Sequence, residues 1–376
     1  MKKINHLMIG LIIILALFNG CKPENAESAK KKDAGDFTFM SIGSFSVEQI
    51  ADNWTEVRDG VGRTLVLIPR GTKAPDGYEP NQIIHVPVKR VVAYSYFDIA
   101  ILKALGVIKD VLVGVTSKMD EWTLPEVIKG MKQGKIVYLG DYNAIDFERL
   151  KVQEPELVLT WDPSIIPMLD KMGVPCVITS TPVAMCLSAR MRFVNFLAPF
   201  FNREKEAKAY FSRVSHSLDQ IRKKASNADH EPKVMWGDIY EKRVLVEPGN
   251  AWVGELVGLA QSDYMFDDVY GKSCIEISLE RFLYSGEDAD ILFTYRTKKT
   301  GATSKAALAR TNAMLAGVKP LKDGKVYSPL PNYAQSGDKL DEILMDIAAI
   351  LHPECYPGHQ LRYFIELPDK DPEREG

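Results

Sequence analysis

Two segments of this chain share one local pattern that decides the fold: IDFERLKVQEPELVLTW at residues 145–161 and ISLERFLYSGEDADILFTY at residues 277–295. Each copy begins with a residue that can cap a helix, Asp146 or Ser278, and continues with an apolar–Glu–Arg–apolar unit. Each copy ends in an apolar run that closes on Thr and an aromatic residue. The pattern predicts a short helix followed by a strand in two similar α/β units.

The residues around the first copy predict an α/β lobe that spans residues 37–187. Ser95 followed by Asp98 is typical of a helix start. Short apolar runs alternate with helical spacing and predict strands over residues 90–94, 111–115, 136–139, 157–161 and 174–179. Such alternation favours a mostly parallel sheet covered on both faces. The segment before it, residues 37–87, contains turn-forming breaks and predicts only a few irregular strands.

A long helix is expected between the two halves. Residues 202–227 contain no glycine or proline, and their apolar residues recur on one helical stripe, with Asn202 as the N-cap. At 1.5 Å per residue this helix would be ~35 Å long, enough to run along both halves. A shorter helix over residues 189–197 precedes it and is expected to stop at Pro199. Residues 188–228 are therefore interpreted as bridging helices.

The second copy lies in a second α/β lobe, predicted over residues 229–368. Its expected strands cover residues 233–236, 244–246 and 291–295, and its expected helices cover residues 254–260 and 337–351. The polar end, residues 369–376, is interpreted as a frayed tail.

The first residues, MKKINHLMIGLIIILALFNGC, predict an export signal rather than a part of the fold. Two lysines precede an apolar run that is too short to be a comfortable membrane span, and Cys21 follows a small residue. Residues 1–21 resemble a bacterial lipoprotein signal whose Cys21 receives the lipid; a plain signal peptide is the alternative. The polar residues 22–36 would form a flexible tether that holds the protein at the cell envelope, facing the periplasm or the cell exterior.

Composition narrows the function. The chain has 376 residues, a net charge of −3 and an isoelectric point near 6.1, which gives no support for nucleic-acid binding. The sequence lacks a G-x-S-x-G elbow, a P-loop and an H-E-x-x-H motif, so we expect a protein that is not an enzyme and needs no cofactor. His352, Cys355 and His359 are only loosely spaced, and no metal site is predicted there. Free thiols and disulfides stay equally open for Cys176, Cys186, Cys274 and Cys355.

Aromatic residues collect at the ends of the predicted strands. In open parallel sheets, ligands bind beyond the carboxyl ends of the strands, so these residues would line one cleft between two facing lobes. The alternative is that they cover a hydrophobic core. The arginines are candidates for meeting carboxylate or phosphate groups of a ligand. The complete set of predicted ligand-binding residues is Tyr94, Tyr96, Trp161, Arg190, Trp236, Trp252, Tyr295 and Arg296.

Several segments together resemble a known family. They are KRVVAYSYFDIAILKALGV at 89–107, the stretch 138–161 that contains the first repeat, the long helical stretch 202–224, the second repeat, and GKVYSPLPNY at 324–333. In order and spacing they are similar to the periplasmic binding proteins of ABC importers for iron-siderophores, haem and cobalamin. The segment 37–87 departs from that family because it is longer than the usual lead-in strand.

The resemblance implies a fold and a role. The fold would be two Rossmann-like α/β lobes with parallel sheets, bridged by one long rigid α-helix, with the ligand cleft between the lobes. The protein would act as a monomer that captures a metal chelate and delivers it to a dimeric ABC permease. Glu148 and Glu280 fall at the positions that dock on the permease. A chelatase-like enzyme or accessory protein and a structural surface lipoprotein are the alternatives.

Overall fold

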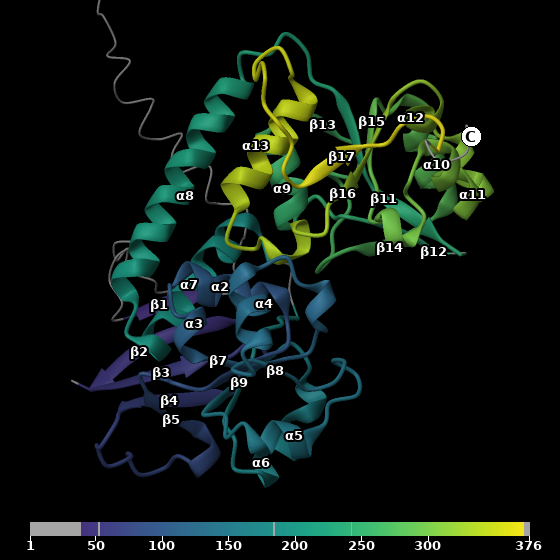
Figure 1. The fold of residues 1–376 in the computed structure, drawn as a ribbon. Coiled ribbons are helices and arrows are strands. Elements are labelled where there is room, and N and C mark those ends of the chain that lie inside the picture. The colour runs from purple at the N-terminus through teal and green to yellow at the C-terminus, as the bar shows by residue number, and fades with distance from the viewer. Residues whose placement is uncertain (1–38, 52, 183–184, 242, 372–376) are drawn as a thin grey trace, which may run out of the picture.

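The computed structural model describes residues 39–51, 53–182, 185–241 and 243–371, which form two α/β lobes and an additional sheet (Figure 1). The sheet of the N-terminal lobe is entirely parallel, as predicted. Its strands, in spatial order, are β10 (Cys176–Ile178), β9 (Leu157–Thr160), β6 (Val91–Ala93), β7 (Leu112–Val115) and β8 (Val137–Tyr138). Its helices are α2 (Tyr96–Ala104), α3 (Ile108–Val111), α4 (Pro125–Lys132), α5 (Phe147–Val152) and α6 (Ile166–Lys171).

The segment before this lobe is more regular than predicted. It forms its own five-stranded sheet of β1 (Phe39–Ile42), β2 (Phe45–Ala51), β3 (Trp54–Arg58), β4 (Thr64–Pro69) and β5 (Ile83–Val86). The sheet packs on the bridging helices through Phe45, whose ring lies 5.0 Å from that of Phe193 and 4.9 Å from that of Phe196. A regular sheet could not be predicted from this segment, because strand pairing depends on partner strands that a single sequence does not reveal.

A buried carboxylate joins the extra sheet to the N-terminal lobe. Asp59 is fully buried and accepts hydrogen bonds from the Arg63 side chain and from the backbone N–H of Ile178 in β10. The next residue, Gly60, donates its N–H to the Ile178 carbonyl at 2.9 Å. A Cβ at Gly60 would lie 1.7 Å from the Ser180 carbonyl oxygen, so only glycine permits this close approach.

The C-terminal lobe has a mixed sheet. Its parallel core consists of β11 (Lys233–Tyr240), β15 (Ile291–Phe293) and β16 (Lys325–Pro329), and β13 (Asp263–Tyr264) also pairs parallel to β11. The antiparallel strands β12 (Arg243–Val246), β14 (Ile275–Ile277) and β17 (Phe364–Glu366) complete it. The helices of this lobe are α9 (Trp252–Leu259), α10 (Leu279–Asp288), α11 (Lys305–Thr311), α12 (Lys319–Lys322) and α13 (Leu340–Leu351).

Short 3₁₀ helices occur in the loops of both lobes. They are η1 (Pro80–Gln82), η2 (Met119–Glu121), η3 (Pro163–Ile165), η4 (Lys298–Thr300), η5 (Ala313–Gly317) and η6 (Tyr333–Gln335). No helix in the described ranges combines the length and the apolar character that crossing a membrane requires.

Two helices bridge the lobes, α7 (Leu187–Phe201) and α8 (Glu204–Ala225). The prediction that the shorter helix stops at Pro199 is wrong: Pro199 lies in the last turn of α7, where burial of Phe196, Phe200 and Phe201 offsets the one hydrogen bond that proline removes. Asn202 does not cap α8 but ends α7 in the left-handed conformation (φ 55°).

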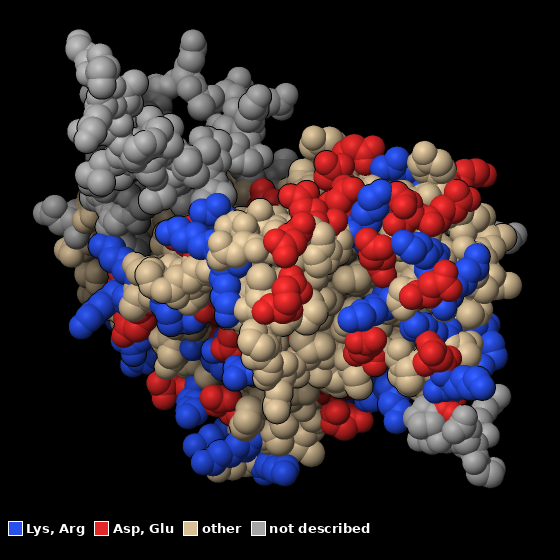
Figure 2. All heavy atoms as spheres, turned by 90° about the horizontal axis from the view of Figure 1, so that it is seen from above, with Lys and Arg blue, Asp and Glu red and all other residues tan. Residues whose placement is uncertain are grey.

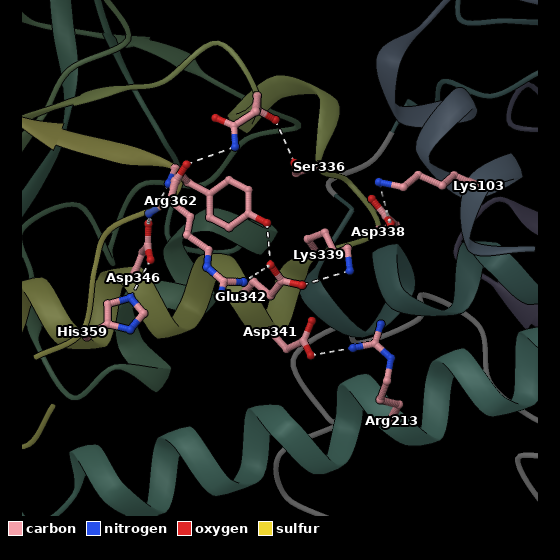
Figure 3. Close-up of polar contacts among 12 residues, drawn as sticks. Lys103, Arg213, Ser336, Asp338, Lys339, Asp341, Glu342, Asp346, His359 and Arg362 are labelled. Atoms are coloured by element: carbon pink, nitrogen blue, oxygen red, sulfur yellow. Dashed lines mark hydrogen bonds and ion pairs between the residues drawn. The ribbon is translucent and has the colours of Figure 1, made fainter. Parts of the chain in front are cut away.

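The long helix α8 packs along α13 of the C-terminal lobe (Figures 1 and 3). Arg213 of α8 pairs with Asp341 of α13 at 2.8 Å. Further along α13, the fully buried carboxylate of Asp346 accepts hydrogen bonds from His359 Nε2 and from the backbone N–H of Arg362, each at 2.7 Å. The Arg213–Asp341 pair ties α8 to α13, and the bonds of Asp346 tie α13 to the segment that follows it.

The described start of the C-terminal tail is not frayed, contrary to the prediction. Asp369 pairs with Lys305, and Asp371 pairs with Arg310 and accepts a hydrogen bond from Thr303. These contacts anchor residues 369–371 to α11, because the acidic side chains of the tail meet basic ones of the helix.

Residues of η6 and the loop after it hold the lobes together. Gln335, which is 2% exposed, accepts hydrogen bonds at 2.9 Å from both the N–H and the hydroxyl of Thr123 and donates one at 2.7 Å to the Glu121 carbonyl. Next to it, Asp338 lies 3.8 Å from Lys103 of α2 (Figure 3). Gln335 therefore acts as a buried latch between the lobes.

Replacing Gln335 by leucine should destabilise the protein by about 1–3 kcal/mol, because the hydrogen bonds from the buried Gln335 amide to the Thr123 N–H and the Glu121 carbonyl are lost. Urea unfolding monitored by circular dichroism measures the change. The matched control is Gln220→Leu on the exposed face of α8, which should stay within about 0.5 kcal/mol of wild type. Equal stabilities of the two variants would contradict the latch.

Candidate inter-lobe binding site

The carboxyl ends of both parallel sheets meet at the junction of the lobes. Trp161 follows β9 and the loop to Thr123 follows β7 in the N-terminal lobe, while Tyr295 follows β15 and η6 follows β16 in the C-terminal lobe. The latch of Gln335 joins two of these loops directly. This is the place where open α/β sheets bind ligands.

Arg190 of α7 lies at the centre of this junction. Its guanidinium carbon is 4.1 Å from the ring centre of Phe97 in the N-terminal lobe and 4.2 Å from that of Trp252 in the C-terminal lobe. Its Nε is buried and has no hydrogen-bond partner in the described part of the chain. Burial lowers the pKa of Arg190 to about 10, so the group keeps its charge at neutral pH. Two aromatic faces from opposite lobes thus hold one cation.

Two carboxyl groups act on Arg190, one from each lobe. Burial raises the pKa of Asp98 to about 6, against the stabilising hydrogen bonds of Ser95 and Thr179. Burial also raises the pKa of Glu247, which follows β12, to about 7, although Tyr295 and Arg190 favour the ionised form. Both carboxyl groups can therefore exchange a proton near neutral pH.

Aromatic side chains lie beyond the carboxyl ends of strands in the N-terminal lobe. Trp161 is 40% exposed, and its ring centre lies 5.3 Å from that of Tyr142, which is 52% exposed. Tyr96 is partly buried and meets Trp122 edge to face at 5.0 Å. The Trp161–Tyr142 pair offers a continuous exposed aromatic surface at the carboxyl edge of the sheet.

Other predicted ligand residues lie within the lobes. Tyr94 is buried in a hydrophobic cluster of the N-terminal lobe. Trp236 was expected to end its strand, but that prediction is wrong, because β11 continues to Tyr240 and buries Trp236 against Phe293 at 4.6 Å. Arg296 lies 3.1 Å from the buried carboxylate of Asp238, and its guanidinium therefore serves an internal ion pair.

Tyr295 is only partly buried and lies beside Glu247. Burial and then the Glu247 carboxylate raise the pKa of Tyr295. Of the predicted residues, the structure thus brings Arg190, Trp252 and Tyr295 into one cluster.

A cavity of about 850 Å³ opens beside the ends of β15 and β16. Its walls include Lys299, Arg310, Glu366 and Asp371 together with the apolar side chains of residues 329–331, 365 and 367–368. Sequence reasoning missed this cavity because its walls come from segments that lie far apart in the sequence. It also missed Glu247, although the rule that ligands bind beyond strand ends applies directly to a residue that follows a strand.

The raised pKa of Glu247 has a measurable consequence. The folded state holds the proton from the unfolded pKa, near 4.5, up to about pH 7, so this group destabilises the fold progressively as the pH rises through that window. Glu247→Gln mimics the protonated form. The variant should gain on the order of 2 kcal/mol over wild type between pH 5 and pH 8, measured by urea unfolding. A difference that does not depend on pH would contradict this account.

Comparison with known proteins agrees with this architecture. A family model described as periplasmic binding protein matches residues 91–333. Two uncharacterized lipoproteins of Methanocaldococcus jannaschii are similar: one is 27% identical, covering 82% of this chain and 77% of the relative, and the other is 24% identical, covering 98% and 100%.

Solved structures share the fold. A periplasmic heme binding protein from Pseudomonas aeruginosa superposes with a TM-score of 0.59 at 17% identity, over 74% of this chain and 98% of that chain. An S. aureus protein complexed with heme gives a TM-score of 0.55 at 18% identity, over 70% and 99%. Because the family model spans both lobes and the helices that bridge them, this chain belongs to the periplasmic binding protein family.

Proposed function

We propose that this protein is the lipid-anchored solute-binding component of an ABC importer, and that it captures a metal chelate such as an iron-siderophore, haem or a corrinoid. Family membership supports the role of a solute-binding protein. Two of the proteins that share the fold are named as heme binding or as a heme complex, which supports this ligand class. The relatives named as lipoproteins support an anchor at Cys21, which lies outside the described residues.

The exposed Trp161–Tyr142 pair carries the ligand proposal. Its two rings lie at the carboxyl edge of the N-terminal sheet and present aromatic surface to solvent. Soluble proteins rarely leave paired aromatic rings uncovered without a binding role. A large chelate with planar or aromatic parts would stack on this surface and remove it from water.

Basic side chains near the C-terminal lobe complement this surface. Lys299 and Arg310 line the cavity of about 850 Å³, a volume within the usual range for sites that hold compact ligands. Arg310 pairs with Asp371, which lines the same cavity, so the cavity carries charges of both signs. Lys299 is the cation proposed to meet an anionic group of a chelate, such as a propionate, a catecholate or a phosphate.

The alternative function, an enzyme, would require titratable groups with shifted pKa values at the lobe junction. The carboxyl groups of Asp98 and Glu247 are such groups. In a binding protein they tune the charge around Arg190. The experiment that separates the two roles incubates the protein with hemin, a ferric catecholate or cobalamin and analyses the ligand afterwards. Recovery of the ligand unchanged supports binding, and conversion of the ligand with turnover supports the enzyme.

Glu148 and Glu280 are proposed as the residues that dock on the permease. Each is an exposed glutamate in the first turn of its helix, α5 or α10, and each helix is capped by the side chain of Asp146 or Ser278. Figure 1 shows α5 at the lower edge of the N-terminal lobe and α10 at the right of the C-terminal lobe.

The arginine that follows each glutamate fixes the helix in the same way. Arg149 donates to the Tyr138 carbonyl at 3.1 Å, and Arg281 donates to the Met265 carbonyl at 2.9 Å. The two lobes therefore present matching carboxylates on matching rigid supports. Such a pair suits a two-fold symmetric partner with basic residues at its surface.

Trp161→Ala should weaken binding of the ligand by ten-fold to a hundred-fold, because one buried aromatic contact contributes roughly 1–3 kcal/mol. Absorbance titrations with hemin, a ferric catecholate and cobalamin identify the ligand and measure the affinity. The melting temperature should stay unchanged, since the side chain is exposed. Tyr284→Ala, another exposed aromatic substitution, serves as the control. Affinity equal to wild type in Trp161→Ala would remove this surface from the binding site.

The double variant Glu148→Ala and Glu280→Ala should bind the ligand with wild-type affinity. It should lower ligand-dependent ATP hydrolysis by the reconstituted importer at least ten-fold, because both docking charges are missing. The control pair, Asp110→Ala and Glu287→Ala, removes the same charge from other exposed positions on the two lobes. Normal stimulation by the docking variant would eliminate the proposed contact.

A further inference from the structure

Three potential metal ligands meet at the end of the C-terminal lobe that is remote from the N-terminal lobe. They are His230, His352 and Glu354, and one ligand atom from each lies within 4.8 Å of the other two. His230 follows α8, whose 22 residues carry the chain about 33 Å away from the N-terminal lobe. The group is therefore distinct from the inter-lobe site, and the inference does not depend on the proposed function.

His352 is held as a metal ligand would be. Its ring is fully buried, and its Nε2 lies 2.8 Å from the Ala260 carbonyl and 3.0 Å from the Gln261 carbonyl. Carbonyl oxygens only accept hydrogen bonds, so Nε2 carries the proton and Nδ1 keeps its lone pair. Nδ1 has no hydrogen-bond partner among the described residues although it is buried. A backbone carbonyl on the far nitrogen is the usual support of a metal-bound imidazole.

The other two groups are placed to complete the site. The ring centre of His230 lies 5.7 Å from that of His352, at 74° between the ring planes. A carboxylate oxygen of Glu354 lies 3.8 Å from Nδ1 of His352. Both His230 and Glu354 are exposed, so small rotations of their side chains bring them to the ~2.0–2.2 Å of zinc bonds.

We propose that His230, His352 and Glu354 bind one divalent transition-metal ion of the zinc class, with solvent completing the coordination. Two imidazoles and one carboxylate form a typical donor set for this ion, whereas calcium and magnesium prefer oxygen ligands alone. The set considered from the sequence combined His352 with Cys355 and His359, but His359 is already bonded to the buried carboxylate of Asp346.

Acidic side chains near this group favour a cation. An open pocket of about 510 Å³ is lined by Glu231, the residue after His230, and by Ser262 and Asp263, which follow the Gln261 carbonyl that supports His352. Glu255 and Asp267 also line this pocket. Figure 2 looks down on this end of the molecule and shows acidic side chains there, interspersed with lysines and arginines. The negative potential of the acidic side chains raises the local concentration of divalent cations.

The bound ion would join three elements that lie far apart in the sequence. His230 belongs to the connection between α8 and β11, His352 ends α13, and the carbonyls that orient His352 end α9. Because the ion binds the folded protein and not the unfolded chain, it would stabilise the remote end of the C-terminal lobe.

The test titrates the purified full chain, freed of metal by a chelator, with zinc chloride alone by calorimetry. We expect one equivalent bound with micromolar or tighter affinity and a melting temperature raised by several degrees. Cobalt(II) chloride should give the visible absorption bands of a low-symmetry site with nitrogen ligands. Magnesium chloride at the same concentration should have no effect on the melting temperature.

Variants of single residues test whether zinc binds at His230, His352 and Glu354 or elsewhere on the surface. His230→Ala and Glu354→Gln change exposed residues, so both should fold normally and weaken zinc binding at least ten-fold. His216→Ala, an exposed histidine on α8, should bind zinc like wild type, and Glu231→Gln, which removes one charge near the site but no ligand, should weaken binding no more than about two-fold. Absence of stoichiometric binding, or unchanged affinity in His230→Ala, would overturn the proposal, and so would a loss confined to Glu231→Gln.

Discussion

The buried face of α8 is the constraint on which the arrangement of both lobes depends. Its apolar stripe lies against α7 and α13, and its buried side chains recur at helical spacing from Ala207 to Ala225. The stripe is covered by α7 on one side and by α13 of the C-terminal lobe on the other, with a smaller contact to α2 of the N-terminal lobe. The position of α8 therefore also sets where the strand ends of the two sheets meet.

Much of this architecture could be predicted from local patterns. The repeated unit, the cap at Ser95 and the stripe of α8 are signals that a single element carries in its own residues. The five-stranded sheet before Val91 could not be predicted, because its order rests on pairing between strands. The predicted helix end at Pro199 was wrong, because burial of the neighbouring phenylalanines outweighs the tendency of proline to end a helix.

The residues of the candidate site likewise fall into those that could be predicted from the sequence and those that could not. Arg190, Trp252 and Tyr295 were accessible to prediction, since they stand near helix starts or strand ends. Phe97, Glu247 and Gln335 were not singled out, because their partners lie far away in the sequence: Arg190 of α7 for the first two, and residues 121–123 for Gln335. Trp236 was misjudged, since a strand four residues longer moved it from the edge of the sheet into the core. Contacts between distant segments thus define most of the chemistry.

The latch formed by Gln335 affects ligand capture and ligand release differently. A protein whose lobes are already joined across a buried amide spends little binding free energy on closing, so a ligand meets a surface that is organised in advance. Release of the ligand would then require the lobes to separate against those same bonds. Preorganisation favours capture and makes release costly, and in the importer role proposed above the transporter would supply the force that separates the lobes.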